Sequence, residues 1–252
     1  MSARPSSSSA FLLVAALLPL SLAACGRVPG QFEILNNAVP PTSGSCLIPV
    51  APAVYRGEGS LDVSIVQPGF DSAYLLFPLI ENNLPGGPSA GHDPNQIQMT
   101  GFDVDLSVIG TASAAALTVM QTADPSLLHY RVPWSGGISS GGGQVAALVS
   151  VVPVELAAEL ATNGGLGTSP SLTLNARVQA LGTTTNGTSM TSDPFNYPIE
   201  VCSGCLIGNL GPCPYKTTPT NLGNVCNPAQ DAVVDCCTDN GTLICPAVVS
   251  TQ

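Results

Sequence analysis

The placement of the cysteines is the feature that most constrains this chain. Of its nine cysteines, Cys25 directly follows an apolar segment and Cys46 stands alone, while seven lie near the C-terminus at Cys202, Cys205, Cys213, Cys226, Cys236, Cys237 and Cys245. Without Cys25 eight remain, and an even number in an exported chain predicts a disulfide framework. The full pairing stays open, but Cys46 must bond to one of the C-terminal seven. Because a bond between neighbours is strained, Cys236 and Cys237 should each pair elsewhere.

Residues 1–24 have the features of a signal peptide. Arg4 precedes a run of serines, and a 12-residue, mainly apolar stretch extends from Phe11 to Leu22. A helix needs about 20 apolar residues to cross a bilayer, so this stretch predicts an export signal and not a transmembrane anchor.

The sequence Leu22-Ala23-Ala24-Cys25 resembles the lipobox of bacterial lipoproteins. The resemblance implies cleavage before Cys25, acylation of its thiol with groups such as palmitate, and membrane anchoring by several acyl chains. Gly26 differs from the aspartate that resembles an inner-membrane retention signal, which favours the outer membrane. We therefore expect a lipid-anchored protein on the periplasmic face of the outer membrane or on the cell surface.

Charge composition excludes some partners. The chain has 16 acidic and 6 basic side chains. It therefore lacks the basic stripe with which proteins contact the phosphates of nucleic acids, and we expect no nucleic-acid partner. The same shortage argues against electrostatic binding of anionic lipid headgroups.

Residues 46–201 repeatedly alternate apolar and polar side chains, which is typical of strands with one buried face. The alternation is clearest at 61–65, 102–108, 172–180 and 195–201. More continuously apolar stretches at 73–80 and 144–152 predict two central strands, 127–134 predicts another, and Pro153 favours a short helix over 153–161. We therefore expect an all-β fold, an immunoglobulin- or fibronectin-like antiparallel sandwich with one short helix.

Composition divides the mature chain into three parts. Residues 25–45 are rich in Gly, Pro, Asn, Thr and Ser, so they predict a flexible tether that begins at the lipidated Cys25. Residues 46–201 would form the sandwich. Residues 202–252 contain few large apolar side chains, so they predict a small Cys-rich module stapled by disulfides.

Several motifs resemble a group of bacterial lipoproteins of the myxobacterial type that has no assigned activity. They are Pro78–Leu84, Asp193-Pro194-Phe195 with Pro198-Ile199, Cys202–Cys205, and the stretch from Cys226-Asn227-Pro228 to Asp235-Cys236-Cys237. The resemblance implies a lipid-anchored location and a Cys-rich C-terminal tail, and it implies no mechanism.

One motif resembles a catalytic sequence. Gly137-Ile138-Ser139-Ser140-Gly141 matches the G-x-S-x-G pattern of hydrolase nucleophiles. In that fold the histidine follows the serine, whereas His92 and His129 both precede it here. We therefore interpret the motif as a flexible loop and expect both histidines to be structural or solvated.

Two sets of carboxylates could bind a cation. Asp103 and Asp105 point the same way on a predicted strand, where the simpler interpretation is a solvated face. Asp231, Asp235 and Asp239 would share a face if their stretch were helical. Calcium binding stays open for both sets, because hard cations prefer several oxygen ligands.

The C-x2-C motif of Cys202 and Cys205 could form a zinc knuckle or a redox pair. The oxidising compartment and the lack of a second C-x2-C motif favour a structural disulfide instead. The sequence thus predicts no metal site and no cofactor.

These features favour a non-enzymatic binding or structural module with an unidentified protein or glycan partner. Its contacts would come from loops such as Asn82–Gln96 and Ser135–Gly143, because loops carry most binding residues. Two alternatives stay open. One is an exported hydrolase with acidic catalytic residues that the sequence does not place, and the other is an effector or inhibitor activity in the Cys-rich tail.

Overall fold

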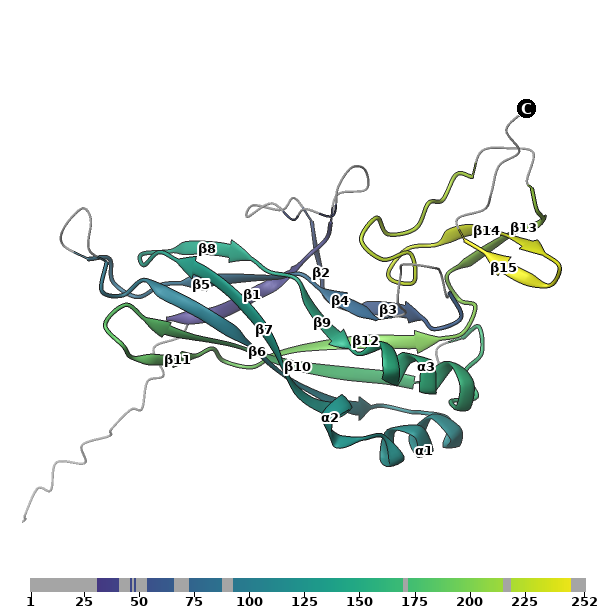
Figure 1. Ribbon diagram of the computed structural model, residues 1–252, viewed down its shortest axis with the longest axis horizontal. Coiled ribbons are helices and arrows are strands. Elements are labelled where there is room, and N and C mark those ends of the chain that lie inside the picture. The colour runs from purple at the N-terminus through teal and green to yellow at the C-terminus, as the bar shows by residue number, and fades with distance from the viewer. Residues whose placement is uncertain are drawn as a thin grey trace, which may run out of the picture.

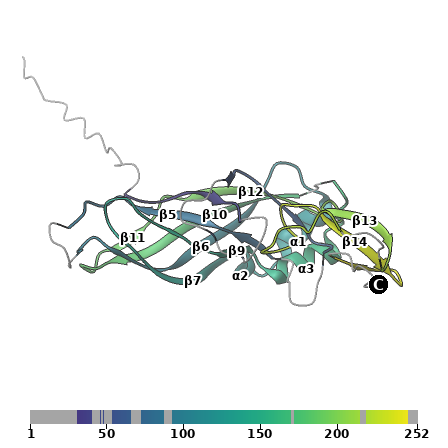
Figure 2. The ribbon, with the colours of Figure 1, turned by 90° about the horizontal axis from the view of Figure 1, so that it is seen from above.

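The computed structural model of the chain describes residues 31–40, 46, 48, 54–65, 73–87, 93–169, 172–214 and 219–245. Strands dominate these residues, and disulfides join the cysteines of the C-terminal part. The expected all-β fold with a disulfide-rich tail is confirmed. The molecule is elongated, with the tail strands at one end and a group of hairpin turns at the other (Figure 1 and Figure 2).

The larger sheet has the strand order β3-β12-β10-β6-β7, and β11 pairs with the last part of β10. Its strands are β3 (Gly59–Asp62), β6 (Ile97–Ile109), β7 (His129–Ile138), β10 (Leu172–Thr184), β11 (Ser189–Thr191) and β12 (Phe195–Cys202). Neighbouring strands are antiparallel except β3 and β12, which are parallel. The alternation in the sequence falls on β6, β10 and β12, where every second side chain is buried over most of the length.

The smaller sheet has the order β2-β1-β5-β8, and β4 forms a separate pair with β9. These strands are β1 (Phe32–Ala38), β2 (Tyr55–Arg56), β4 (Tyr74–Leu76), β5 (Pro78–Asn82), β8 (Gly143–Ala146) and β9 (Val149–Val152). The expectation of single central strands at 73–80 and 144–152 is wrong. Each stretch breaks into two strands, at Phe77 and at 147–148, and Ala147 N donates to Pro78 O (3.0 Å) beside the break. A continuously apolar stretch has no period that would reveal such a break.

Strand β1 corrects the flexible tether expected over residues 25–45. Phe32 and Ile34 are buried in the core, and β1 pairs with β5 from Phe32 beside Asn82 to Asn37 beside Pro78. Burial against β5, which is distant in sequence, outweighs the local composition. Cys25 and the signal segment lie outside the described residues, so lipidation stays a prediction. Among the described helices, none is long and apolar enough to cross a membrane.

Three helices occur in the described chain where one was expected. The predicted helix is present as α3 (Val154–Asn163), directly after Pro153. The other two, α1 (Ala114–Thr122) and α2 (Pro125–Leu128), were not predicted.

Side-chain caps explain the two unpredicted helices. Ser113 Oγ accepts from Ala116 N (3.1 Å) at the start of α1. Asp124 Oδ1 accepts from Ser126 N (2.8 Å) at the start of α2, where Pro125 is the first helical residue. Because α2 occupies 125–128, the strand expected over 127–134 begins only at His129.

A single core cluster joins the two sheets as the layers of a sandwich. It contains Phe32 and Ile80 from the smaller sheet and Phe102, Leu174 and Tyr197 from the larger one. Each of these large side chains contributes about 1.5–3 kcal/mol through its removal from water. The side chains at alternate, buried positions of the long strands therefore hold the two sheets together. The turns and the tail extend from this sandwich.

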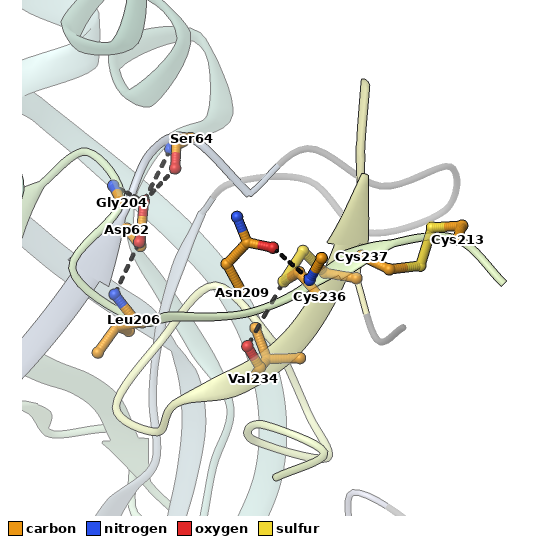
Figure 3. Close-up of a disulfide and its surroundings, with 11 residues drawn as sticks. Asp62, Ser64, Gly204, Leu206, Asn209, Cys213, Val234, Cys236 and Cys237 are labelled. Carbon is orange, nitrogen blue, oxygen red and sulfur yellow. Dashed lines mark hydrogen bonds between the residues drawn. A yellow bond between two sulfur atoms is a disulfide. The ribbon is translucent and has the colours of Figure 1, made fainter. Parts of the chain in front are cut away.

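The tail contains β13 (Ile207–Pro212), β14 (Val234–Asp239) and β15 (Thr242–Ile244), in that order across a small sheet. The four disulfides are Cys46–Cys226, Cys202–Cys205, Cys213–Cys237 and Cys236–Cys245. The predicted bond from Cys46 to the C-terminal group is confirmed, as is the separate pairing of Cys236 and Cys237. Figure 3 shows Cys213 bonded to Cys237 beside β14.

Candidate functional site

The two loops that the sequence singled out meet at one end of the sandwich. Gly141 N donates to Leu84 O (2.8 Å), and Gly142 N donates to Asn82 O (2.9 Å). We call this region the loop end and define it as the described residues 83–87, 93–96, 139–142 and 184–188. It lies opposite the tail strands in Figure 1.

Asn82, the last residue of β5, holds the loop end together. Its side chain is fully buried. Nδ2 donates to Asn95 O (2.9 Å) and to Ile138 O (3.1 Å), while Oδ1 accepts from Leu84 N (3.1 Å). One amide thus satisfies main-chain groups of three separate segments, which a larger or apolar side chain could not do.

Asp93 fixes the turn between β7 and β8. Its carboxylate accepts from Ser140 N (3.0 Å) and from Ser140 Oγ (2.9 Å), and these hydrogen bonds lower the pKa of Asp93. Ser139, Ser140 and Gly141 form a hairpin turn, which agrees with the loop interpretation, but Gly137 and Ile138 belong to strand β7, so the loop expected over 135–143 is wrong for residues 135–138. Ser139 is exposed on this turn, and His92 lies outside the described residues.

The third segment of the loop end is the turn between β10 and β11. Gly187 has φ 89°, a left-handed conformation that favours glycine, and Gly187 N donates to Thr184 O (2.8 Å). Thr185 Oγ1 reaches across to Asp93 O (2.8 Å) and Gln96 O (3.1 Å). The turn signal at Asn186-Gly187 is confirmed, and the segment is tied to the other loops.

The chemistry of the loop end is that of a neutral, hydrogen-bonding surface. Asp93 is the only charged side chain among its described residues, and apart from the apolar Leu84 the others are amides, hydroxyls, glycines and prolines. Such a surface can contact a partner through hydrogen bonds and shape. It offers no cluster of carboxylates and histidines for a metal ion within the described part.

Asp103 and Asp105 lie on the outer face of the larger sheet, as the solvated-face interpretation predicted. Arg131 Nε donates to Asp103 Oδ1 (2.8 Å). Asp105 contacts His129 Nδ1 (2.8 Å) and Arg177 NH1 (2.8 Å), and the hydrogen bond with His129 is the largest cause of the lowered pKa of Asp105. Cross-strand bases thus occupy both carboxylates, which leaves them poorly suited to calcium.

Asp231, Asp235 and Asp239 do not share a helical face, so that alternative is wrong. Asp235 and Asp239 belong to strand β14, and Asp231 precedes it with φ 66°. The Asp235 carboxylate accepts from Thr220 N (2.8 Å) and Asn221 N (2.9 Å), and bonds from Asn221 are the main cause that lowers its pKa to about 2. Asp235 thus organises a loop of the tail.

Asp231 enters the sandwich, where sequence reasoning did not place it. Its side chain is only 8% exposed, and its carboxylate accepts from Tyr74 OH (3.0 Å) and Ser60 N (3.0 Å), with Arg56 Nε at 3.8 Å. Burial is the main cause that raises the pKa of Asp231, and it raises the pKa of Tyr197, which contacts Tyr74, to about 12. No local signal marks these residues, because they come from four distant segments.

Asp62 is buried beside the C-x2-C motif and ties it to the sandwich. Its carboxylate accepts from Gly204 N (2.8 Å), Leu206 N (2.8 Å), Ser64 N (3.0 Å) and Ser64 Oγ (2.6 Å), as Figure 3 shows. The oxygen lies within 4.8 Å of the sulfurs of Cys202 and Cys205. Because those sulfurs are bonded to each other and four donors surround the carboxylate, the arrangement is that of a structural tie.

Trp134, the only tryptophan of the chain, lies between two shallow hollows on the side of the sandwich. One hollow of about 250 Å³ is lined in part by Phe77 and Leu148. The other, of about 400 Å³, is lined in part by Met99 and Pro133. The sequence did not indicate either hollow.

The site geometry therefore presents a neutral loop end, a tail bound into the sandwich through Asp231 and Asp62, and a paired-charge face on the larger sheet. Comparison of the chain with models of protein families, with curated proteins and with solved structures finds no match.

Proposed function

We propose that the chain is a lipid-anchored protein of the outer membrane or cell surface that acts as a non-enzymatic binding or structural module. The observation that carries this proposal is the loop end. Two loops chosen from their turn chemistry lie against each other and share hydrogen bonds through Asn82 and Asp93. Loops held in fixed positions by a rigid sandwich are a common form of binding surface.

The proposed location is supported by two features. The sequence around Cys25 is similar to a lipobox, and acyl chains on that cysteine would anchor the mature protein. The four disulfides suit an oxidising compartment outside the cytoplasm, where such bonds persist.

Within the described part of the chain, the histidine present, His129, lies too far from the serines of the loop end to act as their base. A nucleophile and its base must lie within hydrogen-bond reach of each other. His129 begins the 10-residue strand β7, and the turn with Ser139 and Ser140 follows the end of that strand, about 30 Å away at the usual rise per residue. Ser140 Oγ is also bonded to Asp93.

Two measurements test the proposal. The intact mass of protein purified from membranes should correspond to a chain that begins at Cys25, carries acyl groups and gains two hydrogens per disulfide on reduction. A photo-reactive residue at the exposed Ser139 should give a defined adduct with a protein, glycan or lipid in intact cells. The matched position is Thr242, which is exposed on the tail.

Different results would contradict different parts of the proposal. A chain without acyl groups would remove the anchor. An adduct from Thr242 and none from Ser139 would move the contact surface to the tail. Turnover of ester, glycoside or peptide substrates by the purified protein, with no adduct from either position, would indicate an enzyme.

A further inference from the structure

We infer that the loop end faces the membrane that holds the lipid on Cys25, and that the disulfide-rich tail projects away from it. The inference rests on the proposed lipid anchor. It names the headgroup layer of that membrane as the surface that the loop end contacts.

The first step is the short distance in sequence between Cys25 and the folded region. Gln31, the first described residue, comes six positions after Cys25. Six residues in the most extended conformation span about 20 Å. Acyl chains would hold Cys25 at the membrane surface, so Gln31 must lie within about that distance of the headgroups.

The second step is the position of Gln31 in the fold. Gln31 O accepts a hydrogen bond from Asn83 N (2.8 Å), and the next residue, Phe32, pairs with Asn82. The main chain of Asn82 and Leu84 is in turn bonded to the turn between β7 and β8. Gln31, the described residue nearest to Cys25 in sequence, therefore lies directly beside the loop end.

The third step is the distance from the loop end to the tail. Strand β10 has 13 residues and runs from Leu172, beside Val201 at the start of the tail, to Thr184 in the loop end. At the usual rise this strand is about 40 Å long. Figure 1 and Figure 2 agree that the tail strands and the turns occupy opposite ends of the long axis. Because the tether begins beside the loop end, the loop end and the tail can be equally close to the membrane only if the molecule lies flat on it.

Charge favours the upright orientation over the flat one. The chain has a net charge of −10, and an anionic leaflet repels it. The loop end carries one charged side chain, Asp93, among its described residues, whereas Glu200 and Asp239 lie on the sheet and the tail. An end-on arrangement keeps the carboxylates of the sheet and the tail away from the membrane surface, and the nearest ones after Asp93 are Glu33 and Glu81, which pair across β1 and β5. Because the loop end has no described basic residue, the contact depends on the tether and should persist at high salt.

The test measures energy transfer from single tryptophans to a labelled membrane. The membrane-purified, acylated protein is placed in vesicles of phosphatidylethanolamine and phosphatidylglycerol that contain dansyl-phosphatidylethanolamine. In a Trp134→Phe background, Ser139→Trp puts the donor on the loop end and Thr242→Trp puts it on the tail. Both replaced residues are exposed. We expect severalfold more transfer from Ser139→Trp, in low and in high salt.

Two controls keep the result interpretable. Thermal melting of each variant shows whether it is folded, and if Trp134→Phe lowers the melting temperature, both donors are measured with Trp134 retained and its signal subtracted. A flexible Gly-Ser insertion of about ten residues between Gly30 and Gln31 should reduce the transfer from Ser139→Trp, because a longer tether lets the loop end leave the surface.

The outcomes separate the inference from the proposal on which it rests. In acylated protein, equal transfer from the two donors, or more transfer from Thr242→Trp, would overturn the proposed orientation and leave the lipid anchor intact. The loop end would then be the proposed binding surface for a protein or glycan instead. A chain without acyl groups would overturn both.

Discussion

Tyr74 and Asp231 are 157 residues apart in sequence, and the Tyr74 hydroxyl donates to the Asp231 carboxylate at 3.0 Å inside the sandwich. Gln230 strengthens the same junction, because its side chain accepts from Leu75 N (2.8 Å) and donates to Leu75 O (3.0 Å) as a neighbouring strand would. The segment before β14 is therefore part of the packing of β4. We expect the tail and the sandwich to unfold as one cooperative unit.

The first prediction concerns the charge of Asp231. Burial raises its pKa in the folded protein above the unfolded value of about 4. A raised carboxyl pKa contributes stability at low pH that is lost as the pH rises through the folded pKa. Asp231→Asn should therefore change the free energy of unfolding by less than about 1 kcal/mol at pH 7. As the pH falls and Asp231 of the wild type becomes protonated, the variant should become less stable relative to the wild type. Urea unfolding between pH 3 and pH 7 measures this difference.

The control for this prediction is Asp235→Asn, for which the sign is reversed. Hydrogen bonds from Asn221 are the main cause that lowers the pKa of Asp235 to about 2, so its contribution is present above pH 4 and lost toward pH 2. Asp235→Asn should therefore cost most stability near neutral pH. If the stability losses of the two variants change with pH in the same direction, the two carboxylates do not have pKa shifts of opposite sign and the prediction is contradicted.

The long strands could be predicted because each has one buried face and one solvated face. Alternation in β10 marks its buried residues Leu174, Ala176 and Val178 directly. The break at Phe77 could not be predicted, since the residues on both sides of it are buried and the period disappears. Strand β1 was missed because its burial comes from β5 and not from local composition.

For the candidate site, too, local features could be predicted from the sequence and long-range contacts could not. Turn chemistry at Asn186-Gly187 and in the glycine-rich stretch at 139–142 is local, so these turns could be found from the sequence, although the glycines at 136 and 137 proved to be part of strand β7. That Asn82 joins them depends on hydrogen bonds to residues 13 and 56 positions away. The burial of Asp62 is likewise set by partners more than 140 positions away, at Gly204 and Leu206, and an alternating pattern predicts it to be solvated.

The second prediction concerns Asp62 as the tie between β3 and the C-x2-C turn. Asp62→Ala removes the acceptor of three main-chain N–H groups, at Ser64, Gly204 and Leu206. These N–H groups are part-buried, so each unsatisfied donor costs toward the lower end of about 1–3 kcal/mol, and the variant should lose about 3 kcal/mol in urea unfolding. Ser64→Ala removes one donor and keeps the acceptor, and it should cost less than about 1 kcal/mol. Equal losses in both variants would contradict the role of the carboxylate.

The third prediction compares two disulfides. Cys46–Cys226 closes a sequence separation of 180, whereas Cys236–Cys245 closes one of 9. In the chain-entropy account a longer loop gives a larger stabilisation, so replacing the first pair by serines should cost about 5 kcal/mol and replacing the second should cost about 2.5 kcal/mol less. Denaturant midpoints of the two double variants decide this, and the reverse order would show that local packing around Cys236, which is fully buried, dominates instead.

The fourth prediction tests whether Asn82 organises the loop end. Asn82→Ala leaves Asn95 O, Ile138 O and Leu84 N without their side-chain partner, and it should cost about 2–3 kcal/mol. The neighbouring Asn83 is a matched control, because its exposed side chain bonds only to Glu81 in the described structure, and Asn83→Ala should cost less than about 0.5 kcal/mol. Hydrogen exchange gives the local readout: the amides of Gly141 and Gly142, which bond to the Asn82 segment, should lose protection in Asn82→Ala and keep it in Asn83→Ala. If protection at these glycines is the same in both variants, the turn between β7 and β8 is held by Asp93 alone, and the loop end is not a single unit.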